Sequence, residues 1–166
     1  MKSLLIRAAF SLPALLVATA LRADDLRPPA RPPATWQAEC GACHVAFPPA
    51  LLGATDWQRV MSTLDRHYGD NATLEPAARQ EIEAFLVREA GRVPKHSGGG
   101  TAPAELPRLT AAPWFVREHR EVPATLWQHE KVKSAANCTA CHTRAAAGSY
   151  REREIVMPGV RRNKEH

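Results

Sequence analysis

The feature that most constrains this chain is a five-residue pattern that occurs twice. Residues 40–44 read CGACH and residues 138–142 read CTACH, so both have the form Cys-x-x-Cys-His. These two segments contain all four cysteines of the 166-residue chain. A chain that places every thiol in this frame uses its cysteines for one chemistry, and that chemistry also involves the adjacent histidine.

Three common uses of Cys-x-x-Cys fit this arrangement poorly. Paired motifs that bind zinc are usually separated by about 15–20 residues, whereas Cys43 and Cys138 are much farther apart. A redox dithiol usually occurs once, in a βαβ context, and has a reactive thiolate. Structural disulfides suit an oxidising compartment, but they do not explain a histidine directly after each second cysteine.

The remaining use is covalent attachment of haem, for which Cys-x-x-Cys-His is the recognised frame. Two thiols one helical turn apart reach the two vinyl groups of the macrocycle and form thioethers, and the next side chain lies under the iron. Aromatic residues make up only 6% of the chain, so haem would also supply part of the core. We predict two covalently bound c-type haems, with thioethers from Cys40, Cys43, Cys138 and Cys141 and axial ligation by His44 and His142.

Residues 1–23 have the layout of a secretory signal peptide. Two basic residues precede an apolar run, Ala8–Leu21, and small residues allow cleavage after Ala20 or after Ala23. The run is short for a membrane span, and an uncleaved anchor is the alternative. We therefore expect export to a bacterial periplasm. Removing this segment lowers the formal charge from +5 to +2, and no basic stripe interleaved with aromatics follows, so we expect no nucleic-acid partner.

The rest of the chain divides into two parts with one motif each. Glycine, serine and proline mark residues 96–107 as a linker, between an N-terminal haem lobe at 24–95 and a C-terminal haem lobe at 108–166. Apolar residues at helical spacing, without the alternating runs typical of strands, predict a mainly α, two-lobed c-type cytochrome with little or no sheet. The clearest helical stripe consists of Trp57, Val60, Met61 and Leu64.

Capping residues predict where individual helices begin and end. Thr35 is expected to cap the helix that leads into the first motif, and Asp56 is expected to cap the next one. A third helix is expected after Thr73. Residues 134–148, SAANCTACHTRAAAG, are interpreted as a capped helix that carries the second motif and ends at a glycine.

The ligand on the opposite side of each iron decides between electron transfer and chemistry at an open position. Several side chains are candidates: His67, His96, His119, His129, His166, Met61 and Met157. For the first haem we favour His67, because it continues the apolar stripe of the second helix. The alternative interpretation is a helix-end histidine bonded to carbonyl groups, and Met61 on the same face is typical of core packing.

For the second haem, the choice lies between His119 and His129. The apolar cluster Trp114–Val116 precedes His119 and could flank a haem face. His129 lies only a short stretch before Cys138, and at about 3.3–3.6 Å per residue this leaves little chain to reach the far side of a haem. We therefore prefer His119. The other side chains are expected to pack or to face solvent: Met157, His96 and His166.

Four stretches of the chain resemble the dihaem cytochrome c family, whose best-known members come from purple photosynthetic bacteria. They are CGACHVAFPPALL, DWQRVMSTLDRHYGDNATL, PWFVREHREVP and VKSAANCTACHTRAAAG, in the family's order. The resemblance implies a periplasmic electron carrier with two low-potential haems, each held by two histidines, and implies His67 and His119 as the distal ligands. It also implies redox partners, namely an oxygen-binding monohaem cytochrome c (the sphaeroides haem protein) and a membrane cytochrome b.

The motifs and the resemblance together predict an electron carrier that is not an enzyme and has no small-molecule substrate. The alternative is a dihaem enzyme, such as a peroxidase, or a gas-binding protein with one open coordination position. The chain that remains after residue 23 leaves little room for a substrate pocket, and no acid–base constellation is apparent near either motif.

Overall fold

The computed structural model describes residues 26, 29, 31–91 and 106–159. The predicted signal peptide, 1–23, therefore lies outside the described residues, as does all but the end of the predicted linker at 96–107. Among the residues that are described, no helix is long and apolar enough to span a membrane.

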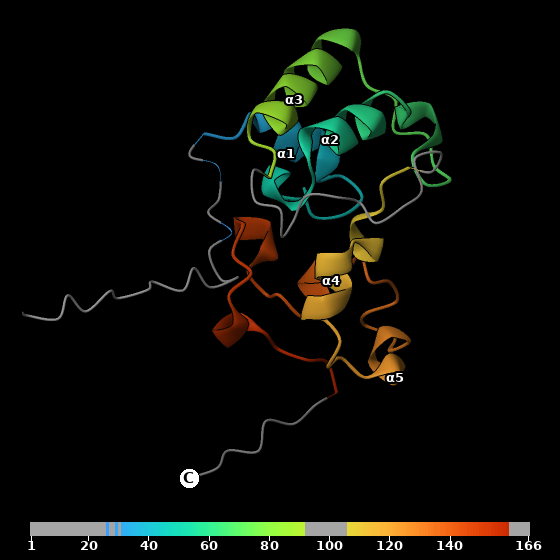
Figure 1. Cartoon of the computed structure of the whole chain (residues 1–166), viewed down its shortest axis with the longest axis vertical. Helices are drawn as coiled ribbons and strands as arrows, with labels where there is room; N and C mark the ends of the chain where they lie inside the picture. Colours follow the sequence, from blue (N-terminus) through green and yellow to red (C-terminus); the bar gives the residue numbers. More distant parts are fainter. Residues whose placement is uncertain (1–25, 27–28, 30, 92–105, 160–166) are drawn as a thin grey trace, which may run out of the picture.

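The helices form two groups, which correspond to two lobes (Figure 1). One lobe contains α1 (Ala34–Cys40), α2 (Ala54–Met61) and α3 (Pro76–Arg88). The other contains α4 (Pro113–Glu118) and α5 (Ala124–Trp127). Short 3₁₀ helices lie between or after them, at Pro49–Leu51, Leu64–Arg66, Leu109–Ala111, Cys138–Ala140, Ala145–Ala147 and Glu152–Glu154.

The first lobe is built on the packing of α2 against α3. The predicted stripe of α2 is buried, and it meets Ile82, Phe85 and Leu86 of α3, which are at most 1% exposed. The indole Nε1 of Trp57 donates a hydrogen bond of 2.7 Å to the Pro49 carbonyl. Trp36, near the start of α1, is buried in the same apolar cluster and anchors this helix to α2 and α3.

The predicted helix starts are wrong by a few residues in this lobe. Helix α1 begins after Pro33, and the Thr35 hydroxyl donates to Glu81 of α3 at 2.8 Å instead of capping its own helix. Helix α2 begins after Gly53, so Asp56 lies in the first turn, where a carboxylate interacts favourably with the helix dipole. Helix α3 begins at Pro76 instead of after Thr73, since proline is well suited to a first helical position.

The second lobe contains less regular structure. The α-helix predicted over residues 134–148 is wrong, because this stretch forms two 3₁₀ turns that end at Gly148 in the left-handed conformation. The Asn137 side-chain amide donates to the Val132 carbonyl at 3.1 Å. A short polar side chain that bonds to nearby backbone competes with helix formation, and here it holds the chain in a turn before Cys138.

Part of the second lobe extends the apolar core of the first lobe. The residues that join the same apolar cluster are Leu109, Ala112, Trp114 and Phe115.

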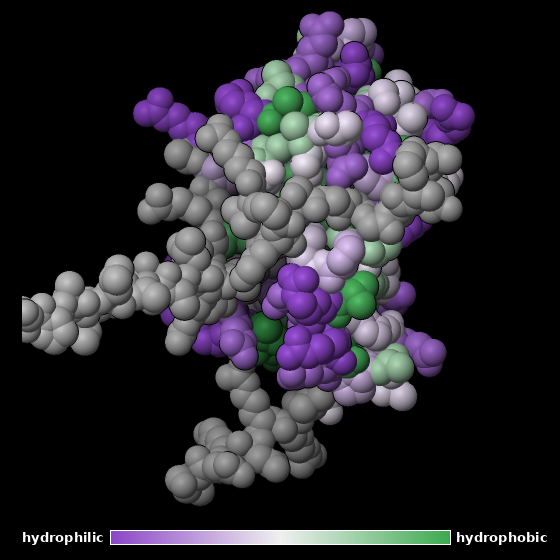
Figure 2. Space-filling view, in the orientation of Figure 1, coloured by the Kyte–Doolittle hydropathy of each residue, from purple (hydrophilic) through white to green (hydrophobic). Residues whose placement is uncertain are grey.

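Hydrophilic residues cover much of the visible face of both lobes, and hydrophobic ones show as small patches (Figure 2). Only isolated β-bridges, with no strand, occur among the described residues. The predicted mainly α fold is therefore confirmed.

Candidate haem sites

The first Cys-x-x-Cys-His motif begins where α1 ends. Cys40 is the last residue of α1, and Gly41 follows as its C-cap. A Cβ at Gly41 would collide with the Gln37 carbonyl oxygen, so only glycine fits this turn without a shift of the backbone. His44 follows this turn; its Nδ1 pairs with the Val45 carbonyl at 2.8 Å, and Phe47 stacks on its ring with centroids 4.5 Å apart.

His67 lies opposite His44, although not on a helix as predicted. Helix α2 ends at Met61, and His67 follows the 3₁₀ turn Leu64–Arg66. The next residues, Tyr68 and Gly69, have φ values of 54° and 110°, and this tight turn is closed by a 3.1 Å bond from the Asp70 N–H to the His67 carbonyl. The ring centroids of His44 and His67 are 6.4 Å apart and their planes are 18° from parallel.

The second motif lies in a 3₁₀ turn that starts at Cys138, and the His142 N–H donates to the Cys138 carbonyl at 2.8 Å. The segment after the motif folds back over it, since the Val156 N–H donates to the Cys141 carbonyl at 2.9 Å. The ring of Tyr150 lies 5.3 Å from that of His142. The Nδ1 of His142 and the hydroxyl of Tyr150 are both buried without a hydrogen-bond partner, which is unusual for polar groups in a complete site.

His119 occupies the position opposite His142. It is the C-cap of α4, its Nδ1 pairs with the Phe115 carbonyl at 2.8 Å, and its ring stacks on Phe115 at 4.0 Å. The ring centroids of His119 and His142 are 6.1 Å apart, with planes 72° from parallel. The structure thus pairs each motif histidine with a second histidine from elsewhere in the chain.

Both ring separations match the space that one metal atom needs. Imidazole nitrogens bind a transition metal at about 2.0–2.1 Å. Two nitrogens on opposite sides of one metal atom therefore lie about 4 Å apart, and the centroids of their rings lie about 6.3 Å apart. The observed values are 6.4 Å and 6.1 Å. No group of three or more His, Cys, Asp or Glu side chains within the described ranges could hold a metal ion on its own. Two histidines per site instead suit an iron whose other four ligands come from a macrocycle.

The other predicted ligand candidates lie elsewhere. His129 accepts a 3.1 Å hydrogen bond from the Lys131 N–H on its Nδ1, and its Nε2 lies 3.2 Å from the Cβ position of Gly159. Met61 is only 3% exposed and packs in the core of the first lobe. Met157 is partly exposed. His96 and His166 lie outside the described residues.

In each site, burial disfavours the charged form of one histidine and of at least one cysteine. Burial, followed by the charge of His44, lowers the pKa of His67, and burial, followed by His119, lowers the pKa of His142. Burial also raises the pKa of Cys40 to about 11 and that of Cys138 to about 11. A raised thiol pKa is the opposite of what a reactive dithiol needs, whereas a neutral imidazole is the form that binds a metal.

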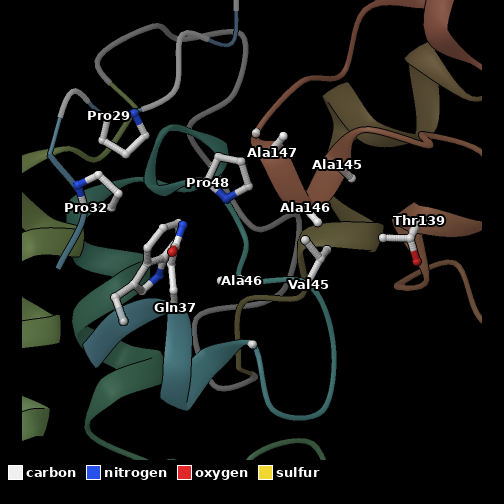
Figure 3. Close-up of a pocket in the computed structure, with 13 residues that line it drawn as sticks. Pro29, Pro32, Gln37, Val45, Ala46, Pro48, Thr139, Ala145, Ala146 and Ala147 are labelled. Carbon is white, nitrogen blue, oxygen red and sulfur yellow. The ribbon is translucent and has the colours of Figure 1, made fainter. Parts of the chain in front are cut away.

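One cavity of about 560 Å³ lies between the two motifs. Figure 3 shows that its wall combines the segment after the first motif, with Val45 and Ala46, and the turn after the second motif, with Ala145, Ala146 and Ala147. These side chains are small and apolar. Gly41 of the first motif and Thr139 of the second also line the cavity, whereas none of the cysteines and histidines predicted to hold the haems does.

The sequence pattern did not single out Phe47, and it placed Phe115 beside a haem face instead of against the His119 ring. Phe47 follows His44 by three residues, and Phe115 precedes His119 by one helical turn. Aromatic rings at such spacings are a usable signal, because residues three or four apart face each other on a helix or tight turn. Tyr68 and Tyr150 carry no comparable local signal, since their partners depend on the tertiary fold.

Comparisons with known proteins identify the family of this chain. The family model described as dihaem cytochrome c matches residues 36–150. A diheme cytochrome type c from Shewanella baltica OS155 is 34% identical, with a TM-score of 0.65 over 76% of this chain and 93% of its own. DHC purified from Rhodobacter sphaeroides is 38% identical, with a TM-score of 0.59 over 70% of this chain and 95% of its own.

A second structure, of diheme cytochrome c from Rhodobacter sphaeroides, gives 38% identity and a TM-score of 0.60 over 70% of this chain and 94% of its own. No match was found among curated proteins. Because the family match spans both attachment motifs and the greater part of the sequence, the chain belongs to the dihaem cytochrome c family and carries two covalently attached c-type haems.

Proposed function

We propose that this protein is a periplasmic electron carrier in which each haem iron is held by two histidines. His44 and His67 bind the first iron, and His142 and His119 bind the second. The observation that carries this proposal is the pair of ring separations, 6.4 Å and 6.1 Å, each suited to one iron between two imidazoles. Haem supplies a reversible one-electron couple, and two strong axial ligands leave no position for a substrate.

The chain's own groups prepare these histidines for the iron. In the neutral tautomer that binds through Nε2, the Nδ1–H of His44 donates to the Val45 carbonyl and that of His119 to the Phe115 carbonyl. A hydrogen bond at Nδ1 fixes the ring's orientation and makes Nε2 a better donor to the metal. Burial lowers the pKa of His67 and of His142, which favours the neutral imidazole that binds a metal.

The proposal extends to location, potential and partners. The pattern of residues 1–23 supports export. Two histidine ligands favour a lower reduction potential than a histidine and a methionine do. As partners we propose redox proteins, either an oxygen-binding monohaem cytochrome c or a membrane cytochrome b, on the basis of membership of the family. A peroxidase-like or gas-binding role would need a histidine that leaves one of the irons.

Carbon monoxide binding and electron paramagnetic resonance test the ligand assignment. The reduced wild-type protein should bind almost no carbon monoxide, and the oxidised protein should be entirely low-spin. His67→Ala and His119→Ala should each lose the low-spin signal of one haem and bind one carbon monoxide per chain. His129→Ala is the matched control, because the His129 Nδ1 accepts a hydrogen bond from the Lys131 N–H, and it should behave as wild type. Rapid stoichiometric binding by the wild type, or peroxide turnover above that of free haem, would support the alternative function.

A further inference from the structure

The turn that presents His67 contains a tyrosine in a conformation that suits it poorly. Tyr68 has a φ of 54°, a left-handed backbone that bulky residues rarely adopt. Two backbone bonds hold the turn locally, from the Asp70 N–H to the His67 carbonyl and from the Ala72 N–H to the Leu64 carbonyl. A residue in such a conformation persists only where surrounding contacts determine it, so the contacts of the Tyr68 side chain identify what holds the turn.

Those contacts come from Pro107 and Arg108, where the linker meets the second lobe. The Tyr68 hydroxyl donates a 2.5 Å hydrogen bond to the Pro107 carbonyl, and the Arg108 guanidinium lies 4.8 Å above the Tyr68 ring. Pro107 is among the fully buried side chains, at less than 2% exposure, so the acceptor is firmly placed. The same tyrosine ring also meets the His67 ring edge-on at 4.8 Å. We call the contact of Tyr68 with Pro107 and Arg108 the tyrosine clasp.

The tyrosine clasp joins the loops that lead to both distal histidines. On one side, Tyr68 directly follows His67. On the other, Pro107 and Arg108 continue into the 3₁₀ helix Leu109–Ala111 and then into α4, which ends at His119. In Figure 1 this segment starts beside the loop after α2 and descends to α4.

We propose that Tyr68 is a positioning residue that holds His67 over the first haem by fastening its turn to Pro107 and Arg108. The proposal rests on His67 being the distal ligand. The competing interpretation is a surface tyrosine of no consequence, since the residue is 37% exposed. Two observations favour the clasp. The hydroxyl is bonded to the carbonyl of Pro107, a fully buried residue directly before the second lobe, and the ring contacts the ligand itself.

Tyr68→Phe tests the clasp because it keeps the ring and removes only the hydroxyl. Without this hydrogen bond His67 should leave the iron more often, and carbon monoxide should bind the reduced first haem roughly two- to tenfold faster than in wild type. Backbone amides of Leu109–Ala111 should also exchange with solvent faster. His67→Ala and His119→Ala supply the reference spectra of an opened first and second site, so the haem that responds can be identified.

Trp57→Phe is the matched control, because it removes another side-chain bond to a proline carbonyl in the same lobe, that to Pro49. It should lower stability without speeding carbon monoxide binding. An equal increase in the rate of carbon monoxide binding in Trp57→Phe and Tyr68→Phe would overturn the clasp, because a general loss of stability in the first lobe would then explain both. Wild-type behaviour of Tyr68→Phe beside an opened site in His67→Ala would also overturn the clasp and leave the proposed function intact. An unopened site in His67→Ala would refute the ligand assignment and the clasp with it.

Discussion

The two histidine pairs differ in the angle between their rings, and this difference predicts two distinct spectra. The rings of His44 and His67 are 18° from parallel, whereas those of His119 and His142 are 72° from parallel. Each imidazole interacts with the iron d orbital that lies perpendicular to its own plane. Two imidazoles with near-parallel planes interact with the same d orbital and separate its energy from that of the second, perpendicular d orbital. Two imidazoles with crossed planes interact with one d orbital each and leave the two energies almost equal.

The first haem should consequently give a rhombic low-spin signal, and the second a much more anisotropic one. Low-temperature electron paramagnetic resonance of the oxidised protein measures both. His67→Ala should remove the rhombic signal alone, and His119→Ala the anisotropic signal alone. Two similar rhombic signals in the wild type, or removal of the anisotropic one by His67→Ala, would refute the link between the ring angles and the two sites.

A milder substitution tests what sets the angle between the rings of His119 and His142. The ring of His119 is held by its bond to the Phe115 carbonyl and by stacking on the Phe115 ring, 21° from parallel. Phe115→Leu keeps the carbonyl and removes the stacked ring. The anisotropic signal should then broaden as the His119 ring samples more angles, while the rhombic signal stays unchanged.

Three further predictions concern stability. Replacing both cysteines of the second motif with alanine should expose the amides of residues 124–159 to hydrogen exchange, while the amides of α3 stay protected. The reason is that only three apolar residues are buried within 124–159, namely Leu126, Val132 and Ala145. An equal loss of protection in α3 would contradict this prediction. Gly41→Ala should destabilise the protein by about 1–3 kcal/mol in urea titrations, since the added Cβ meets the Gln37 carbonyl. Ile82→Ala, at a site with 0% exposure, should cost about 2–5 kcal/mol and lower the first lobe's unfolding midpoint.

Much of the first lobe could be predicted from the sequence because its helices follow local patterns. The predicted stripe Trp57, Val60, Met61 and Leu64 depends on helical periodicity, and all four residues are buried. The exact helix starts could not be predicted in the same way. Thr35 could have capped α1, but its hydroxyl binds Glu81, which lies far along the chain on α3.

The second lobe shows where local patterns fail. Residues 134–148 contain good helix formers, yet they form 3₁₀ turns around an Asn137 side chain bonded to the preceding backbone. The segment up to Val156 folds back onto the motif, and haem attached to both cysteines is a further constraint. Neither constraint can be recognised in a window of ten or fifteen residues.

The sequence by itself determined the cofactor, because Cys-x-x-Cys-His is a local covalent frame whose chemistry does not depend on the rest of the fold. It also indicated His67 and His119, through the apolar residues around them. Only the tertiary structure decided how these histidines reach the motifs. His67 lies beyond the helix that was expected to carry it, in a turn tied to Pro107 by Tyr68. His119 faces His142 and His129 does not. Such pairings, and the angles between the paired rings, arise from contacts between residues distant in sequence, where local propensity carries no information.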